Sequence, residues 1–177
     1  MVVAIEDTFA SVTDMQERSQ GMITAATHPF LEKELKAATR TIRNACGWHV
    51  AGKGEVTFKR VRPFHDDVWL PAMQIESITS ATVDGAVRAD GFAFDPDTGW
   101  TNIRGCAVDV TFVAGFETVP EDLMLLTLEL AAGGLGTALN ITREQAGAVS
   151  VTYARTSGGM VLADHDRLVP YKLGWLP

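Results

Sequence analysis

The sequence predicts an α+β domain, in which a small helical bundle carries an inserted antiparallel β region and an extended C-terminal arm. Apolar residues recur at helical spacing on both sides of residues 50–114, where the period shifts toward two. The segments carry their own start or stop signals, namely Gly47 after a helix, Asp84-Gly85 after a strand and Pro120 before a helix. None of these segments carries a reactive constellation, which favours a protein that joins other molecules.

The first half of the chain contains two predicted helices after a segment, residues 1–12, that we expect to be flexible. From Thr13, the sequence T-D-M-Q matches a capping box and predicts a short helix over residues 13–20. Thr27 and Pro29 open a second helix over residues 29–46, and Gly47 ends it in a left-handed conformation. The second helix has one apolar stripe, formed by Leu31, Leu35, Ala38, Ile42 and Ala45. Its other side carries Glu32, Lys33, Lys36, Arg40 and Arg43.

Residues 50–114 are predicted to form five or six short antiparallel strands. Val68 to Leu70 is expected to be a separate strand ending at Pro71. Asp84-Gly85 predicts a tight turn, and residues 95–99 predict a longer one. Strict alternation assigns three sets of residues to common faces: Val56, Phe58 and Arg60; Ile75, Ser77, Thr79 and Ala81; Val108, Val110 and Phe112.

A third helix is predicted over residues 119–139. Glu121 and Asp122 in its first turn suit the positive end of the helix dipole. The helix is apolar nearly all round, so we expect it to be buried on several sides. Its glycines, Gly133, Gly134 and Gly136, indicate either a close approach of another backbone or an early end of the helix. Residues 141–177 are expected to form the arm, with a strand at 149–153 and a helical turn at 163–169.

Composition excludes several classes of protein. The net charge of −7 and the pI near 5.0 argue against a nucleic-acid binder, which needs a basic face. The first ten residues lack a basic region, and the apolar run 123–132 is interrupted by Glu129 and too short to span a bilayer. We therefore expect a soluble protein that is made in the cytoplasm and has no membrane partner. Cys46 and Cys106 are expected to be reduced and buried.

No catalytic, cofactor-binding or metal-ligating residue is predicted, and we expect no enzymatic activity. The four histidines are too dispersed for a zinc motif. Asp95, Asp97 and Gly99 begin like a calcium loop, but Trp100 and Cys106 occupy the positions that require Gly and Glu, which favours a turn. Two local His–acid clusters are interpreted as helix caps or solvated turns, residues 65–67 and 164–166.

Two sets of residues are candidates for contact with other molecules. The cations Lys53, Lys59, Arg60 and Arg62 belong either to a solvated strand edge protected by charge or to a contact with DNA or an acidic partner. The end of the chain is unusually apolar for a terminus. It docks either on its own core or on another subunit or protein, where Trp and Tyr are favoured anchors. We predict that the arm contacts a neighbouring subunit or portal protein through Leu168, Tyr171, Leu173, Trp175 and Leu176.

Four short sequences together resemble a known family. They are Ala45-Cys46-Gly47-Trp48, Leu70-Pro71 with the later Asp84-Gly85, Gly115-Phe116 before Pro120, and Asp166-Arg167-Leu168-x-x-Tyr171. These sequences are similar to those of the head-to-tail connector proteins (adaptor or head-completion proteins) of long-tailed bacteriophages, especially the actinobacterial-phage type. The resemblance extends from about Phe9 to Gly174.

The resemblance implies a structural protein of the virion neck. It implies a homo-oligomeric ring, normally twelvefold, that binds beneath the portal protein, extends the DNA channel and offers a platform to a stopper or tail-joining protein. DNA would pass through this channel without specific binding, and no catalytic residue is carried over. Compact family members are almost entirely helical, so the role of the β insertion stays open. Three alternatives are another neck component (stopper or tail terminator), a soluble hydrolase or ligand-binding module, and a protein that grips DNA through Lys53 to Arg62.

Overall fold

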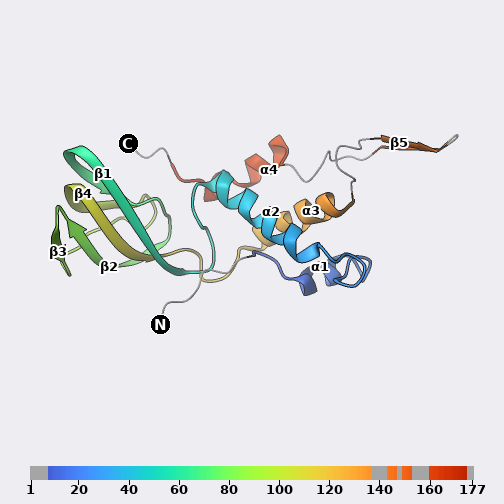
Figure 1. Ribbon diagram of the computed structural model, residues 1–177, viewed down its shortest axis with the longest axis horizontal. Helices are drawn as coiled ribbons and strands as arrows, with labels where there is room; N and C mark the ends of the chain where they lie inside the picture. The colour runs from blue at the N-terminus through green and yellow to red at the C-terminus, as the bar shows by residue number, and fades with distance from the viewer. Residues whose placement is uncertain (1–7, 137–142, 147–148, 153–159, 175–177) are drawn as a thin grey trace. The chain divides into compact units, whose positions relative to one another are not determined.

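The computed structural model describes residues 8–136, 143–146, 149–152 and 160–174 (Figure 1). The chain divides into two compact units. The helical unit comprises Asp7–Ala45 and Pro120–Val169, and the sheet unit comprises Cys46–Val119 with the two chain ends, Met1–Glu6 and Pro170–Pro177. Because helices and an antiparallel sheet are both present, the predicted α+β class is confirmed.

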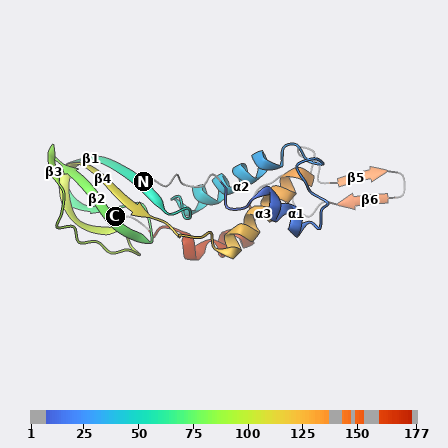
Figure 2. The ribbon, with the colours of Figure 1, turned by 90° about the horizontal axis from the view of Figure 1, so that it is seen from below.

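The helical unit is built around two long helices, α2 (Leu31–Cys46) and α3 (Glu121–Gly136), which lie side by side in both views (Figures 1 and 2). Two short helices, α1 (Val12–Arg18) and α4 (Leu162–Arg167), accompany them. A 3₁₀ turn, η1 (Val169–Tyr171), follows α4. The predicted strand near residue 149 is confirmed as β6 (Val149–Thr152), which pairs with a strand that the sequence did not predict, β5 (Arg143–Ala146).

The start of α1 differs from the prediction. Its N-cap is Ser11, not Thr13, and the helix covers residues 12–18 instead of 13–20. The Ser11 hydroxyl accepts a hydrogen bond from the Asp14 amide (3.1 Å), while the Asp14 carboxylate accepts one from the Ser11 amide (2.7 Å). This reciprocal pair satisfies two amide groups that a helix start leaves open. Because the cap is Ser11, the residue three positions later that completes the capping box is Asp14, and not the predicted Gln16, whose side chain is longer.

Helix α2 confirms the predicted apolar stripe at Leu31, Leu35, Ala38 and Ile42, which are all buried, while the fifth predicted member, Ala45, is half-buried. The helix begins at Leu31, two residues later than predicted, and it ends before Gly47, whose φ of +83° is the expected left-handed conformation. Thr39 on the same side is fully buried, and its hydroxyl oxygen accepts a hydrogen bond from the Phe9 amide (3.0 Å). Phe9 is itself buried. The expectation of a flexible segment is therefore wrong for residues 8–12.

Helix α3 has the predicted burial on several sides, with Leu123, Leu126, Leu128, Leu130 and Ala131 all in the core. The helix continues through Gly133 and Gly134 to Gly136. At Gly134, a Cβ atom would lie 2.6 Å from a carboxylate oxygen of Glu34 on α2. A side chain of α2, and not a second backbone, therefore occupies the space that glycine leaves open.

The sheet unit contains a four-stranded antiparallel sheet among the described residues, in the order β1-β4-β2-β3. Its strands are β1 (Gly54–Trp69), β2 (Ile75–Val83), β3 (Ala86–Arg88) and β4 (Trp100–Ala114). The prediction of five or six short strands is wrong, because Val68 continues β1 and Trp100 starts β4. Pro63 does not end β1, since β1 is an edge strand and Pro63 lies where its pairing with β4 is irregular.

Two β-bulges in β2 overturn the predicted alternation. The register shifts between Ile75 and Ser77 and again between Ile78 and Ser80. Ile78 therefore lies opposite the fully buried Phe112 of β4, although strict alternation placed it on the other face. The predicted face of β4 is confirmed, because Val108, Val110 and Phe112 are all buried.

Both predicted turns of the β region are confirmed. Asp84 and Gly85 connect β2 to β3 with φ values of +48° and +86°, the pair of positive values that a tight hairpin turn requires. In the longer turn, the Asp95 carboxylate accepts a hydrogen bond from the Asp97 amide (3.0 Å). This bond, followed by one from the Thr98 hydroxyl, lowers the pKa of Asp95. Asp95 is thus used to hold a turn.

Candidate assembly surfaces

The chemistry of the described residues is sparse. No group of three metal-ligating side chains in the described ranges lies close enough to hold a metal ion. Over the same residues, no helix combines the length and apolar character needed to cross a membrane. Both cysteines are free thiols, but only Cys46 is buried, and this burial raises its pKa to about 11. Cys106 is half-buried, which corrects the expectation of two buried thiols.

The cations predicted as a possible DNA contact are each paired with a carboxylate of the sheet unit. Lys53 pairs with Glu76 (2.8 Å), and this hydrogen bond raises the pKa of Lys53. Lys59 pairs with Asp109 on the neighbouring strand (2.6 Å). DNA binding is driven by the release of counterions from DNA when protein cations neutralise its phosphates. Cations that are already paired with carboxylates of the sheet contribute little to this release. The arrangement matches the alternative in which charge protects an edge strand.

Asp66 joins two of these cations in the irregular part of β1. Its carboxylate oxygens accept hydrogen bonds from Arg60 and, at 2.7 Å, from Arg62. The Arg60 side chain is only 11% exposed, and its Nε atom has no hydrogen-bond partner among the described residues. The neighbouring Asp67 binds Arg104, and this contact lowers the pKa of Asp67. Residues 65–67 therefore lie within β1 and form ion pairs there, so the interpretation of this cluster as a helix cap or solvated turn is wrong.

We expect Asp66→Asn to lower the free energy of unfolding by roughly 1.5–3 kcal/mol, because it weakens hydrogen bonds to a nearly buried charge. The matched control is Asp109→Asn, which removes a pair whose lysine is 73% exposed and should cost at most about 1 kcal/mol. Urea denaturation followed by circular dichroism measures both values. Equal losses of unfolding free energy in the two variants would show that Asp66 stabilises Arg60 no more than Asp109 stabilises the exposed Lys59.

The helical part of the arm is attached to its own unit. Asp164 in the first turn of α4 is buried, and its carboxylate accepts a hydrogen bond from the Val161 amide (2.9 Å), which confirms a capping role. Arg167 donates a hydrogen bond to Glu129 of α3 (2.8 Å). Leu168 is fully buried. The prediction that Leu168 contacts a second molecule is therefore corrected, since its side chain already lies in the core of this chain.

The next residues of the arm contact the sheet unit. The carbonyl oxygen of Tyr171 accepts a hydrogen bond from the Trp48 indole (2.7 Å), and the Tyr171 ring meets Phe116 edge-on at 5.8 Å. The Leu173 amide donates to the carbonyl of Cys46 (3.1 Å). Both Tyr171 and Leu173 are consequently half-buried. The remaining predicted anchors, Trp175 and Leu176, lie outside the described residues.

The arm nevertheless exposes apolar side chains that the prediction did not select. Val161 and Leu162 at the start of α4 are 45% and 84% exposed, and Val169 in η1 is 61% exposed. Helical spacing could have separated them from Leu168, because Leu162 and Leu168 are six positions apart and lie on different faces of a helix. These three residues, Val161, Leu162 and Val169, form the arm surface in the sections below.

A second apolar surface lies on the sheet. Val61 on β1 and Val87 on β3 are among the most exposed large hydrophobic residues of the structure. An apolar depression of about 220 Å³ lies beside Val61, between β1, β2 and β4. Its lining residues include Lys59, Thr82, Gly85, Ala107 and Val108. Exposed apolar surface of this kind is typical of contact sites between proteins.

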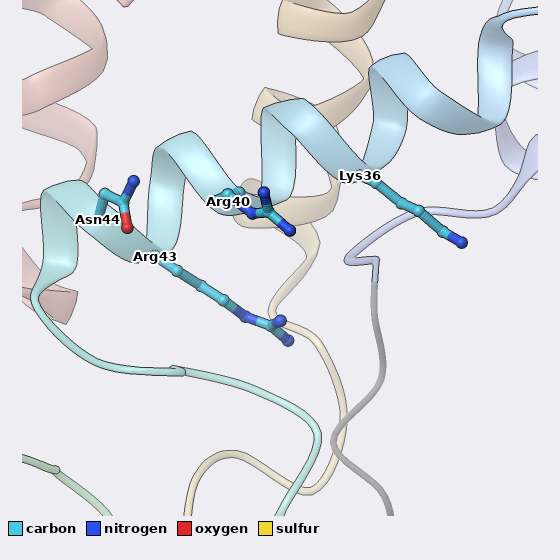
Figure 3. A pocket seen from close by; sticks show the side chains of 4 residues that line it. All are labelled: Lys36, Arg40, Arg43 and Asn44. Atoms are coloured by element: carbon cyan, nitrogen blue, oxygen red, sulfur yellow. The ribbon is translucent and has the colours of Figure 1, made fainter.

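A third surface lies on α2 and is shown in Figure 3. Lys36, Arg40, Arg43 and Asn44 project from one side of the helix and line a depression of about 200 Å³. The sequence analysis placed the three cations on the polar side of this helix without assigning them a role. A signal was available in the sequence, since no Asp or Glu occurs between Glu34 and Glu55.

Comparisons with known proteins give a fold and no family. No family model matches the chain, and no curated protein matches it either. The chain is similar to a solved structure described as "Neck of native GTA particle computed with C12 symmetry", with a TM-score of 0.62, 19% identity, and coverage of 99% of this chain and 95% of that one. It is also similar to "Neck of empty GTA particle computed with C6 symmetry", with a TM-score of 0.60, 16% identity and the same coverage. At these identities the likeness establishes the fold.

Proposed function

We propose that this protein is a structural component of a virion neck, and more specifically a head-to-tail adaptor that forms a ring beneath the portal protein. The observation that carries the proposal is the length of the structural likeness, which covers 99% of this chain and 95% of the neck protein. A match of this extent includes both the helical unit and the sheet unit. It therefore concerns a complete neck-protein fold and not one widely shared motif.

The symmetry of the similar structures supports a ring. The two necks were computed with C12 and C6 symmetry, and both symmetries describe closed rings of repeated copies. In such a ring each copy contacts the next through two different faces, so weak contacts are repeated around the circle and add up. The chain has several surfaces that suit such contacts. The proposed role is structural, without enzymatic activity.

The surfaces suggest a division of tasks within the ring. The arm surface offers Leu162 and Val169 to a neighbouring copy or to the portal protein, together with the predicted anchors Tyr171, Leu173, Trp175 and Leu176. The sheet surface around Val61 and Val87 offers a platform to a stopper or tail-joining protein. The paired cations of the sheet fit a channel through which DNA passes without specific binding.

The order of binding tests the adaptor role against the other neck roles. Full-length protein is mixed with purified portal protein of the same virus, and the mixture is separated by size-exclusion chromatography. An adaptor should co-elute with the portal when no other neck protein is present. Binding that requires a preformed portal–adaptor complex would identify a stopper instead, and binding only to tail tubes would identify a tail terminator.

A further inference from the structure

Helix α2 carries a row of positive charge on the side opposite its buried stripe. Lys33, Lys36, Arg40 and Arg43 recur at steps of three, four and three, so they follow one line along about 15 Å of helix. The acidic residues of α2, Glu32 and Glu34, both lie in its first turn. The rest of the helix therefore has a positive surface with no interleaved carboxylate.

The depression of about 200 Å³ lies along this row (Figure 3). Two guanidinium groups, one ammonium group and the Asn44 amide line it, and none of its described lining residues is acidic. Lys36 pairs with Glu32 at 3.0 Å, and the Arg43 guanidinium lies 4.9 Å from the centre of the Phe9 ring. Arg40 is exposed and forms no ion pair or hydrogen bond with any described residue. The Arg40 guanidinium can therefore donate hydrogen bonds to an anion that enters the depression.

We propose that this depression receives acidic side chains from a second copy of the chain, as one half of the contact between neighbouring copies. The inference rests on the proposed ring. A cyclic ring needs two different faces that complement each other. The chain has 22 acidic and 15 basic residues, so a neighbouring copy can offer carboxylates on much of its surface. Positive surface is scarcer than negative surface on this chain. In the α2 row, the central cation Arg40 has no ion-pair partner among the described residues and can bind a carboxylate of the neighbouring copy.

Electrostatics also gives this surface a role in orientation. Two copies with a net charge of −7 repel each other in most relative positions. Approach of an acidic patch to the α2 row replaces this repulsion with attraction, which favours one register over the others. Duplex DNA has the same anionic chemistry, but a chain with a pI near 5.0 lacks the overall positive charge that DNA binders use. A second copy is therefore the occupant that the charges favour.

The test compares two charge reversals in the full-length protein. Arg40→Glu places a negative charge in the depression, and Arg18→Glu makes the same change at an exposed position of α1. Sedimentation velocity over a range of protein concentrations measures ring formation, alone and with portal protein. We expect Arg40→Glu to raise the concentration at half-assembly by at least about tenfold, because it adds like charge to a contact. Arg18→Glu should leave it unchanged.

A second measurement identifies the partner directly. Wild-type protein of natural and heavy isotope composition is mixed, assembled and treated with a carbodiimide, which joins lysine to carboxylate. We expect peptides that join Lys36 of one isotope form to an acidic residue of the other. A cross-link from Lys36 to Glu32 within one isotope form is expected from their ion pair and serves as the internal reference. Detection of this reference with no cross-link from Lys36 to the other isotope form would oppose the proposal.

The remaining outcomes separate this inference from the proposed function. Rings of Arg40→Glu that form as readily as those of wild type overturn the inference and leave the adaptor role intact. Wild-type protein that forms no ring, alone or with portal, overturns both. If Arg40→Glu assembles normally but loses salt-sensitive binding to duplex DNA, the depression is a nucleic-acid contact and the second-copy proposal is wrong.

Discussion

Leu168→Ala is expected to lower the free energy of unfolding by about 2–5 kcal/mol, which is the range for removing a large side chain from a packed core. Leu168 is fully buried and follows directly after α4. Its removal leaves a cavity that the short helix can close only in part. This loss would show that the arm contributes to the fold of its own chain, contrary to its predicted use as an external anchor.

The matched control is Leu162→Ala, six residues earlier in the same segment. Leu162 is 84% exposed, so its truncation should change the free energy of unfolding by at most about 0.5 kcal/mol. Urea denaturation with circular dichroism and tryptophan fluorescence measures both variants. A Leu168→Ala protein as stable as Leu162→Ala would mean that Leu168 is not buried in solution.

Gly99→Ala is expected to destabilise the sheet unit by about 2–5 kcal/mol. Gly99 closes the turn before β4 with a φ of +77°, a conformation that costs other residues about 1–2 kcal/mol. A Cβ atom there would also overlap the carbonyl oxygen of Leu70 and lie 3.1 Å from that of Ala72. Both neighbours are backbone atoms, so no side-chain rotation relieves the contact. Overpacking of this kind adds about 1–3 kcal/mol.

Gly85→Ala provides the control that separates the steric overlap from the conformational cost. Gly85 has a similar φ of +86°, but nothing lies within 4 Å of the position of its Cβ atom. Only the conformational cost of about 1–2 kcal/mol is therefore expected. Thermal and urea denaturation should place Gly99→Ala clearly below Gly85→Ala in stability. Equal stabilities would indicate that the turn of residues 95–99 does not pack against Leu70.

The parts of the fold that the sequence predicts well depend on local chemistry. The apolar stripe of α2 and the left-handed Gly47 involve residues within a few turns of each other. The same is true of Asp84 and Gly85, whose backbone preferences define a hairpin turn. For such features, the interactions that determine the structure are made between residues close to each other in the sequence.

The features that the sequence did not predict depend on distant partners. The separate strand predicted over Val68 to Leu70 is instead the end of β1, which continues through Pro63. An edge strand tolerates this proline, because β1 pairs with β4 alone among the described strands. The bulges of β2 exist because of its register with β4, which places Ile78 opposite Phe112. Alternation alone carries no information about a bulge.

The candidate surfaces show the same limit. The apolar content of the arm correctly marked it as more than a frayed end, but content does not say which residue is buried. Leu168 lies inside and Leu162 outside. The cations of β1 were selected for their density, yet Lys59 is neutralised by Asp109 on β4 and Arg60 by Asp66 further along β1. On α2, the sequence has no Asp or Glu between Glu34 and Glu55, and the row of cations in this stretch is the surface that we propose to contact a second copy.

The most direct test of the proposed function is cryo-electron microscopy of the full-length protein mixed with portal protein. We expect class averages of a closed ring seated on the portal, with the twelvefold symmetry suggested by the similar neck structure. Single copies at every protein concentration, with no density added to the portal, would contradict the assignment to a virion neck.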